Sequence, residues 1–119
     1  MLWILEDSSS LSSKARKTII DGRNELFWSA ASLWELTVKL SLKKLVLSSE
    51  WREALLEEKS VNRIQDLPVR EDHCFQHLEL PWHHRDPFDR LLICQAMSEK
   101  MTIITKDKSI SQYKVKTLW

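Results

Sequence analysis

The chain has 119 residues, of which 43% are hydrophobic and 29% charged, a balance typical of one globular domain over residues 1–119 and not of a disordered chain. Its 18 Lys and Arg residues against 17 Asp and Glu residues leave a formal net charge of +1, so bulk charge alone indicates no partner. The single glycine, Gly22, excludes the Gly-rich loops that bind dinucleotides or nucleoside triphosphates, because each needs several glycines.

The amino terminus and the cysteines both favour a cytoplasmic protein. No apolar run is long enough to span a bilayer, and the start, MLWILEDSSS, lacks the basic region and the cleavage site of a signal peptide. Cys74 and Cys94 form no Cys-x-x-Cys pair, which fits reduced thiols better than an extracellular disulfide framework. We therefore expect a cytoplasmic domain.

Helices and strands are predicted to alternate along the chain. In chain order we expect a helical fragment over 1–6, a turn over 7–10, a helix from Ser12 or Ser13 to Ile20, a strand over 26–28, helices over 31–45 and 48–59, a strand over 61–67, helices over 71–80 and 87–98, a strand over 101–105, a helical turn over 108–112 and a strand over 115–118. Gly22 stops the first complete helix, and Pro87 opens the helix of the DPFD segment. This alternation predicts an α/β domain with a mostly parallel sheet.

Acidic side chains lie beside three of these elements. Glu35 falls in the first turns of the helix that follows strand 26–28, Asp86 and Asp89 stand three apart at the helix that Pro87 opens, and Asp107 directly follows strand 101–105. Ligands of parallel α/β sheets bind beyond the carboxyl ends of the strands. Carboxylates that converge there suit Mg²⁺ or Mn²⁺, which activates water and stabilises the leaving oxygen of a phosphodiester.

Each acid also has a purely structural interpretation. Ser32-x-x-Glu35 has the spacing of a capping box, Asp86-Pro87 resembles a helix start, and Asp107 is placed to cap a turn. Singly, these acids are typical of caps. Only their convergence favours a metal site.

Histidines and basic residues near these acids allow two interpretations as well. His73, Cys74 and His77 include histidines one helical turn apart, but no further zinc ligands stand at a recognised spacing. The stretch His83-His84-Arg85 either contacts a phosphate group or tunes the site, or it forms a solvated loop. Several basic residues either flank the acids and hold phosphates or form ordinary solvated faces. They are Lys39, Lys43, Lys44, Arg85, Arg90, Lys106 and Lys108.

The segment HHRDPFDRLLICQA resembles the PIN-domain family, specifically the VapC-like toxins of bacterial toxin–antitoxin pairs. The resemblance runs over nearly the whole chain and includes SAASLWELTVKLSLKKL in the middle and MTIITKD near the end. It implies a three-layer α/β/α fold with a mostly parallel sheet and a Mg²⁺- or Mn²⁺-dependent endoribonuclease. It also implies an RNA substrate, a cognate antitoxin and a homodimer, with Trp3 and Trp51 as candidates for the partner surface.

The family's site residues map onto matching positions of this chain. The resemblance implies that Glu35, Asp89 and Asp107 are catalytic and hold the metal, with Asp86 as a lesser ligand or helix cap. Thr105 then adds a hydroxyl beside Asp107. The side chains expected to bind the RNA substrate are Arg85, Arg90, Lys106 and Thr105.

One departure concerns the amino terminus. Relatives begin with an apolar strand that ends in an aspartate, before the residues that match Leu2-Trp3, and Glu6 and Asp7 are poorly placed as substitutes. Loss of that central strand is expected to open a gap of roughly 9–10 Å in the sheet. We expect a late start codon or a truncated chain, with a partner segment in the gap or a degenerate protein as alternatives.

Two rival functions remain at this point. The first is a PIN-like module that binds protein or RNA without catalysis. The second is a small α/β interaction domain in which the acids serve only as caps. Both tolerate the loss of Glu35, Asp89 and Asp107, whereas the nuclease needs all three around a divalent ion.

Overall fold

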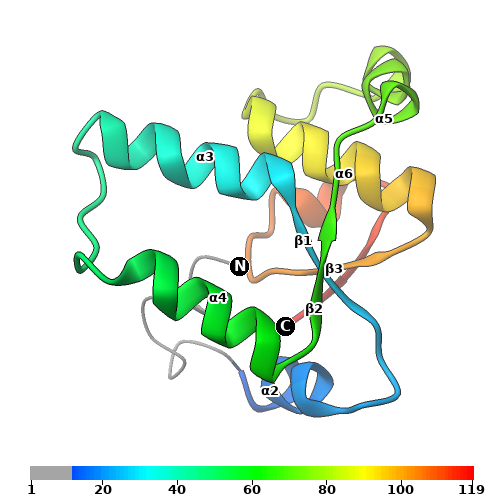
Figure 1. Cartoon of the computed structure of the whole chain (residues 1–119). Helices are drawn as coiled ribbons and strands as arrows, with labels where there is room; N and C mark the ends of the chain where they lie inside the picture. Colours follow the sequence, from blue (N-terminus) through cyan, green and yellow to red (C-terminus); the bar gives the residue numbers. More distant parts are fainter. Residues whose placement is uncertain (1–11) are drawn as a thin grey trace. The chain divides into compact units, whose positions relative to one another are not determined.

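The computed structural model describes residues 12–119, which form two compact units that meet in the sequence at Leu67 and Pro68 (Figure 1). Each unit holds one pair of parallel strands. The expected helical fragment over 1–6, the turn over 7–10, and the roles of Trp3, Glu6 and Asp7 lie outside the described residues. No helix within residues 12–119 is long and apolar enough to cross a membrane.

The first unit is built around a parallel pair of strands with helices in the crossover. Its elements are α2 (Ser13–Ile20), β1 (Leu26–Ser29), α3 (Ala30–Ser41), α4 (Trp51–Val61) and β2 (Ile64–Leu67). Strand β1 pairs with β2 from Leu26 opposite Ile64 to Ser29 opposite Leu67. A parallel pair needs a long connection, and α3 and α4 supply it on one side of the strands (Figure 1).

Serine side chains set the starts of two helices in this unit. Ser12 caps α2 by accepting a hydrogen bond from the amide of Ala15 at 3.0 Å, and Ser29 caps α3 by accepting one from Ala31 at 3.0 Å. Helix α3 therefore begins at Ala30, two residues before Ser32. The capping-box interpretation of Ser32 and Glu35 is wrong, because both residues lie inside the helix.

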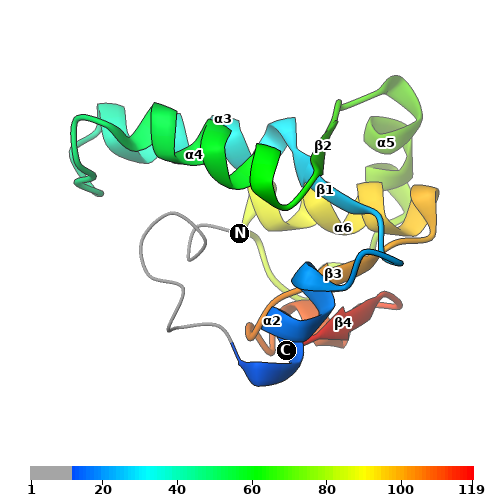
Figure 2. The same cartoon turned by 60° about the horizontal axis from the view of Figure 1, so that its bottom comes forward.

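The second unit packs one long helix against a second parallel pair. Its elements are α5 (Glu71–Gln76), the 3₁₀ turn η2 (His77–Glu79), α6 (Pro87–Glu99), β3 (Thr102–Ile104), the 3₁₀ turn η3 (Ile110–Gln112) and β4 (Lys116–Leu118). Strands β3 and β4 lie side by side, from Thr102 opposite Lys116 to Ile104 opposite Leu118 (Figure 2). The buried core of this unit comprises Leu80, Ile93, Cys94, Ala96, Ile103, Ile110 and Tyr113.

The observed elements agree with the expected α/β alternation and differ at their ends. The helix expected over 31–45 stops at Ser41, and Lys43 then adopts a left-handed conformation with φ 57°. The helix expected over 48–59 extends to Val61, so β2 starts only at Ile64, after Arg63 with φ 53°. Left-handed residues end helices because they turn the chain away from the helical path.

We predict that Ser29→Ala lowers the free energy of unfolding by about 1 kcal/mol, because the amide of Ala31 loses its capping oxygen. Urea denaturation followed by circular dichroism measures this change. Ser32→Ala is the matched control, and we expect it to shift the free energy by less than about 0.5 kcal/mol. Equal losses in the two variants would show that Ser29 is not the cap.

Candidate active site

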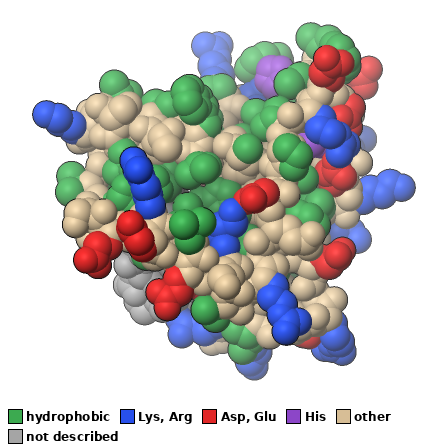
Figure 3. Space-filling view, in the orientation of Figure 1, with side chains coloured by type: hydrophobic (Ala, Val, Ile, Leu, Met, Phe, Trp, Pro, Cys, Tyr) green, Lys and Arg blue, Asp and Glu red, His purple; other side chains and the backbone are tan. Residues whose placement is uncertain are grey.

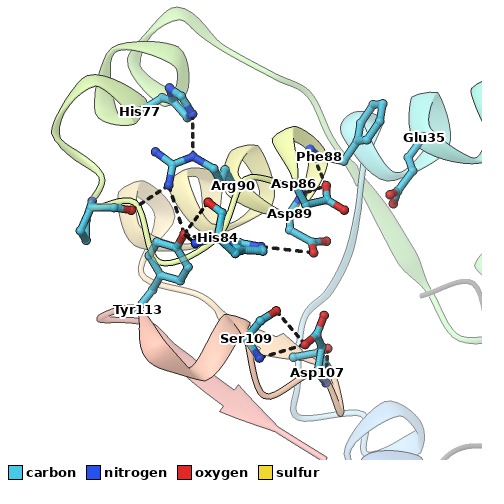
Figure 4. A network of polar contacts seen from close by, with 12 residues as sticks. Glu35, His77, His84, Asp86, Phe88, Asp89, Arg90, Asp107, Ser109 and Tyr113 are labelled. Atoms are coloured by element: carbon cyan, nitrogen blue, oxygen red, sulfur yellow. Dashed lines mark hydrogen bonds and ion pairs between the residues drawn. The ribbon is translucent and has the colours of Figure 1, made fainter.

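The amino-terminal turn of α6 carries two of the predicted acids. Asp86 is the N-cap residue, and its Oδ1 atom accepts hydrogen bonds from the amides of Phe88 at 2.9 Å and Asp89 at 3.0 Å (Figure 4). Pro87 occupies the first helical position, where its missing N–H is no loss. Asp89 lies in the first turn, where the helix dipole favours a negative charge.

These two carboxylates lie close enough to share a cation. One carboxylate oxygen of Asp86 lies within 4.8 Å of a carboxylate oxygen of Asp89. Oxygen ligands of this kind suit the hard ions Mg²⁺ and Mn²⁺. Oδ1 of Asp86 already accepts hydrogen bonds from two amides, so the oxygen of Asp86 that is available to a metal is Oδ2. One pair of residues can therefore both start the helix and hold a metal.

His84 lies against Asp89. Its Nε2 atom is 3.5 Å from Asp89 Oδ2, and its Nδ1 atom is 2.7 Å from the hydroxyl of Tyr113. The Nε2 atom is buried and makes no hydrogen bond within the described part of the chain. Figure 4 shows the imidazole between the phenol on one side and the carboxylate on the other.

Arg90 is a correction to the predicted substrate-binding set. Its side chain is fully buried, with its guanidinium 3.6 Å from the centre of the Trp82 ring. It donates hydrogen bonds to His77 Nε2 at 3.1 Å, the Pro81 carbonyl at 2.7 Å, the Tyr113 hydroxyl at 3.1 Å and the Leu80 carbonyl at 3.2 Å. A guanidinium committed to internal acceptors does not reach an RNA phosphate.

Asp107 caps the turn that leads into η3. Its Oδ1 atom accepts hydrogen bonds from the Ser109 amide at 2.9 Å and the Ser109 hydroxyl at 2.7 Å, and its own amide donates to Thr105 Oγ1 at 3.0 Å. These bonds from Ser109 lower the pKa of Asp107 below its ordinary value. The exposed carboxylate is thus kept ionised, and its second oxygen makes neither of the bonds to Ser109.

Glu35 belongs to the first unit. It lies in the middle of α3, is half-buried, and forms an ion pair with Lys39 at 3.4 Å. This i,i+4 pair matches the structural alternative for Lys39. A surface pair of this kind stabilises a helix only weakly, so the Glu35 carboxylate can exchange it for a stronger interaction with a metal ion.

The remaining predicted contacts to phosphate are on the surface. Arg85 and Lys106 are exposed, and Lys106 lies 5.8 Å from the centre of the Trp119 ring. Thr105 is half-buried, and its hydroxyl accepts a hydrogen bond from the amide of Asp107.

Trp51, expected at a partner surface, is half-buried, with the Arg52 guanidinium 5.6 Å from its ring centre.

The second group of metal-type ligands is an ion-pair cluster. His73 is fully buried, accepts a hydrogen bond at Nδ1 from the Arg70 amide at 3.0 Å, and places Nε2 2.9 Å from Glu99 Oε1. Arg70 also binds Glu99 at 2.7 Å and Asp72 at 2.8 Å, and it lowers the pKa of Asp72 to about 2. A guanidinium inside the group opposes a second cation. His77, which accepts from Arg90, is bonded separately, so the histidines share no site.

Sequence reasoning missed Tyr113. Its hydroxyl contacts both Arg90 and His84, which are 23 and 29 residues away in the sequence. The only local signal is a single tyrosine between a turn and a strand, and such a residue is typical of any core.

The chain matches the family model of the PIN domain over residues 1–116, and it belongs to that family. PIN domains of the VapC type are generally nucleases. The fold is also that of a chain in the crystal structure of VapBC2 from Rickettsia felis bound to a DNA fragment from their promoter. That match has a TM-score of 0.75 at 14% identity and covers 98% of this chain and 90% of the other. No curated protein matches the sequence.

We predict that Arg90→Lys lowers the free energy of unfolding by roughly 1–3 kcal/mol, because an ammonium cannot serve the four acceptors around the guanidinium. Thermal unfolding measures the loss, and exposed Arg85→Lys is the control, expected within about 0.5 kcal/mol of wild type. A stable Arg90→Lys with weaker, salt-sensitive RNA binding would instead restore Arg90 as a phosphate contact.

We predict that Ser109→Ala raises the pKa of Asp107 toward its ordinary value, because one of the two bonds from Ser109 is lost. Carbon-13 NMR titration of the carboxyl group measures it, with Ser111→Ala as the control, since that hydroxyl bonds to the Lys108 carbonyl. The lowered folded pKa means that this stabilisation is present above the unfolded pKa and is lost as pH falls through the folded one. An unchanged pKa in Ser109→Ala would contradict this assignment.

Proposed function

We propose that this PIN domain is a Mg²⁺- or Mn²⁺-dependent endoribonuclease of the VapC-like toxin type, acting in the cytoplasm and inhibited by a cognate antitoxin. The observation that carries the proposal is the carboxylate pair at the start of α6, Asp86 and Asp89, in a chain that belongs to the PIN family. In this structure the pair has the oxygen ligands and spacing that a hard divalent ion prefers.

The metal ligands proposed are Asp89, Glu35 and Asp107, with Asp86 as a lesser ligand through its uncapped oxygen. When bound, the ion supplies an activated water and neutralises charge on the phosphodiester. Glu35 enters this set by the resemblance of SAASLWE to the family's pattern. Asp107 contributes an ionised carboxylate, since Ser109 lowers its pKa, and that carboxylate completes the ligand set and helps to position the attacking water.

The proposed contacts to RNA are the exposed cations near these acids. Arg85 directly precedes Asp86, and Lys106 directly precedes Asp107, so both lie beside the carboxylates where the phosphodiester would bind. The Thr105 hydroxyl fixes the Asp107 amide and so positions the turn. Cations at such positions neutralise phosphates and make binding depend on salt concentration.

Exposed apolar side chains of the first unit support protein partners. Leu33, Trp34 and Leu56 are exposed on α3 and α4, and Trp34 is 64% exposed. Figure 3 shows hydrophobic side chains in this region of the surface. Large exposed apolar groups of this kind are typical of surfaces that bind other proteins. We assign them to an antitoxin and to a homodimer.

We predict that the purified chain cleaves a mixed RNA pool when Mg²⁺ or Mn²⁺ is present and stops when a chelator is added. Asp89→Asn should lower the cleavage rate by more than roughly 100-fold. Loss of a residue that only orients a metal ligand costs roughly 10- to 100-fold, and here a proposed ligand itself is changed. Glu57→Gln, which removes one exposed acid on α4, is the charge-matched control and should cleave like wild type.

Calorimetric titration with Mn²⁺ runs beside the cleavage assay. Metal binding that disappears in Asp89→Asn, together with lost cleavage, would support the nuclease. If the folded wild-type chain and the Asp89→Asn variant both bind RNA and neither cleaves it, the result would favour the non-catalytic module. Equal cleavage by Asp89→Asn would indicate a contaminating nuclease.

A further inference from the structure

We propose that Tyr113 and His84 are positioning residues that hold the carboxylate of Asp89 in the orientation needed to bind metal; this inference rests on the proposed function. They form a chain of polar contacts that starts at the buried guanidinium of Arg90 and ends at Asp89, its neighbour in the sequence (Figure 4). We call this chain of Arg90, Tyr113, His84 and Asp89 the strut.

The groups around the Tyr113 hydroxyl determine which hydrogen bonds it accepts and which one it donates. It accepts from Arg90 Nη1 at 3.1 Å and from the His84 amide at 3.2 Å, and neither group can accept in return. These two donors use both lone pairs of the oxygen. The hydroxyl proton then has two acceptors within reach, His84 Nδ1 at 2.7 Å and the His84 carbonyl at 3.5 Å. The shorter distance is ideal for an O–H donor, and the longer one is at the limit of a hydrogen bond.

This assignment fixes the form of His84. Because Nδ1 accepts the Tyr113 proton, the neutral ring carries its own proton on Nε2. A proton on Nδ1 would bring a third donor to a hydroxyl oxygen that already accepts two. The Nε2 atom is therefore an N–H donor and not a metal ligand.

The Nε2–H group faces Asp89 Oδ2 at 3.5 Å and is buried. A buried donor without a hydrogen bond is unfavourable, so a small rotation of the carboxylate toward the imidazole is favoured. This arrangement restricts the rotation of the Asp89 carboxylate. Residues behind a metal ligand commonly orient it in this way and raise its affinity for the ion.

The anchor of the strut is buried. Arg90 is fully buried and Tyr113 is 4% exposed. The guanidinium of Arg90 also lies over the Trp82 ring, 3.6 Å from its centre. Because Arg90 and Asp89 share one turn of α6, the strut closes a loop of contacts between that helix and the segment that precedes it.

The experiment compares four variants by two readouts that do not need catalysis. The first is nitrogen-15 NMR of the His84 ring in the metal-free protein, which distinguishes Nε2–H from Nδ1–H. The second is the Mn²⁺ dissociation constant by calorimetry. The variants are Tyr113→Phe, His84→Gln, His84→Leu and His83→Leu, each checked for folding by circular dichroism.

We expect Tyr113→Phe to lose the preference for Nε2–H and to bind Mn²⁺ about 10-fold more weakly. His84→Leu should weaken binding by about 10- to 100-fold, and His84→Gln should retain affinity within about 3-fold, because its amide N–H replaces Nε2–H. His83→Leu changes a ring that contacts Tyr113 without facing Asp89, and it should leave the Mn²⁺ affinity unchanged.

Wild-type affinity in a folded Tyr113→Phe or His84→Leu variant would overturn the positioning role, as would a wild-type ring protonated on Nδ1. Equal losses in His84→Gln and His84→Leu would show that His84 only packs, and would also overturn it. If the wild-type chain binds no Mn²⁺, both the proposed function and the role of the strut in orienting a metal ligand are contradicted. The ring tautomer then shows separately whether the strut exists.

Discussion

The buried guanidinium of Arg90 organises the second unit of this protein. Its acceptors are all neutral: one imidazole, two carbonyls and one phenol, with an indole ring against its face. A planar fork of donors can satisfy several such acceptors at once, which an ammonium cannot. Removing the guanidinium would leave buried carbonyls without partners. Arg90 therefore anchors the start of the segment between η2 and α6, at the Leu80 and Pro81 carbonyls, and Tyr113 holds its His84.

The start of α6 caps its helix and, in the proposed function, also holds the metal within four residues. Asp86 accepts the first amides of the helix, and Asp89 follows in the first turn, where the helix dipole stabilises its charge. Capping and metal binding are therefore not alternatives at this position. A cap fixes one carboxylate oxygen and so presents the other in a defined direction. The same holds for Asp107, whose turn is closed by Ser109.

Particular residues show how far the sequence was informative. A cap of α2 at Ser12 or Ser13, the opening of α6 by Pro87 and parallel strand pairing follow from local chemistry and periodicity. The structure selects Ser12 and confirms the role of Pro87 and the parallel pairing. The spacing of Ser32 and Glu35 is that of a capping box, but Ser29 accepts the capping hydrogen bond instead. The sequence predicts a phosphate contact at Arg90 from its charge, but the side chain is fully buried, and charge in a sequence does not indicate burial.

The sequence by itself determined the alternation of helices and strands, the family, and the acids that stand at the start of α6 and after β3, because caps, turns and motifs depend on neighbours in the chain. Only the tertiary structure decided that Arg90 is internal, that Tyr113 connects it to His84, and that His84 faces Asp89. These contacts join residues up to 29 positions apart, and their hydrogen bonds depend on packing that no local pattern encodes.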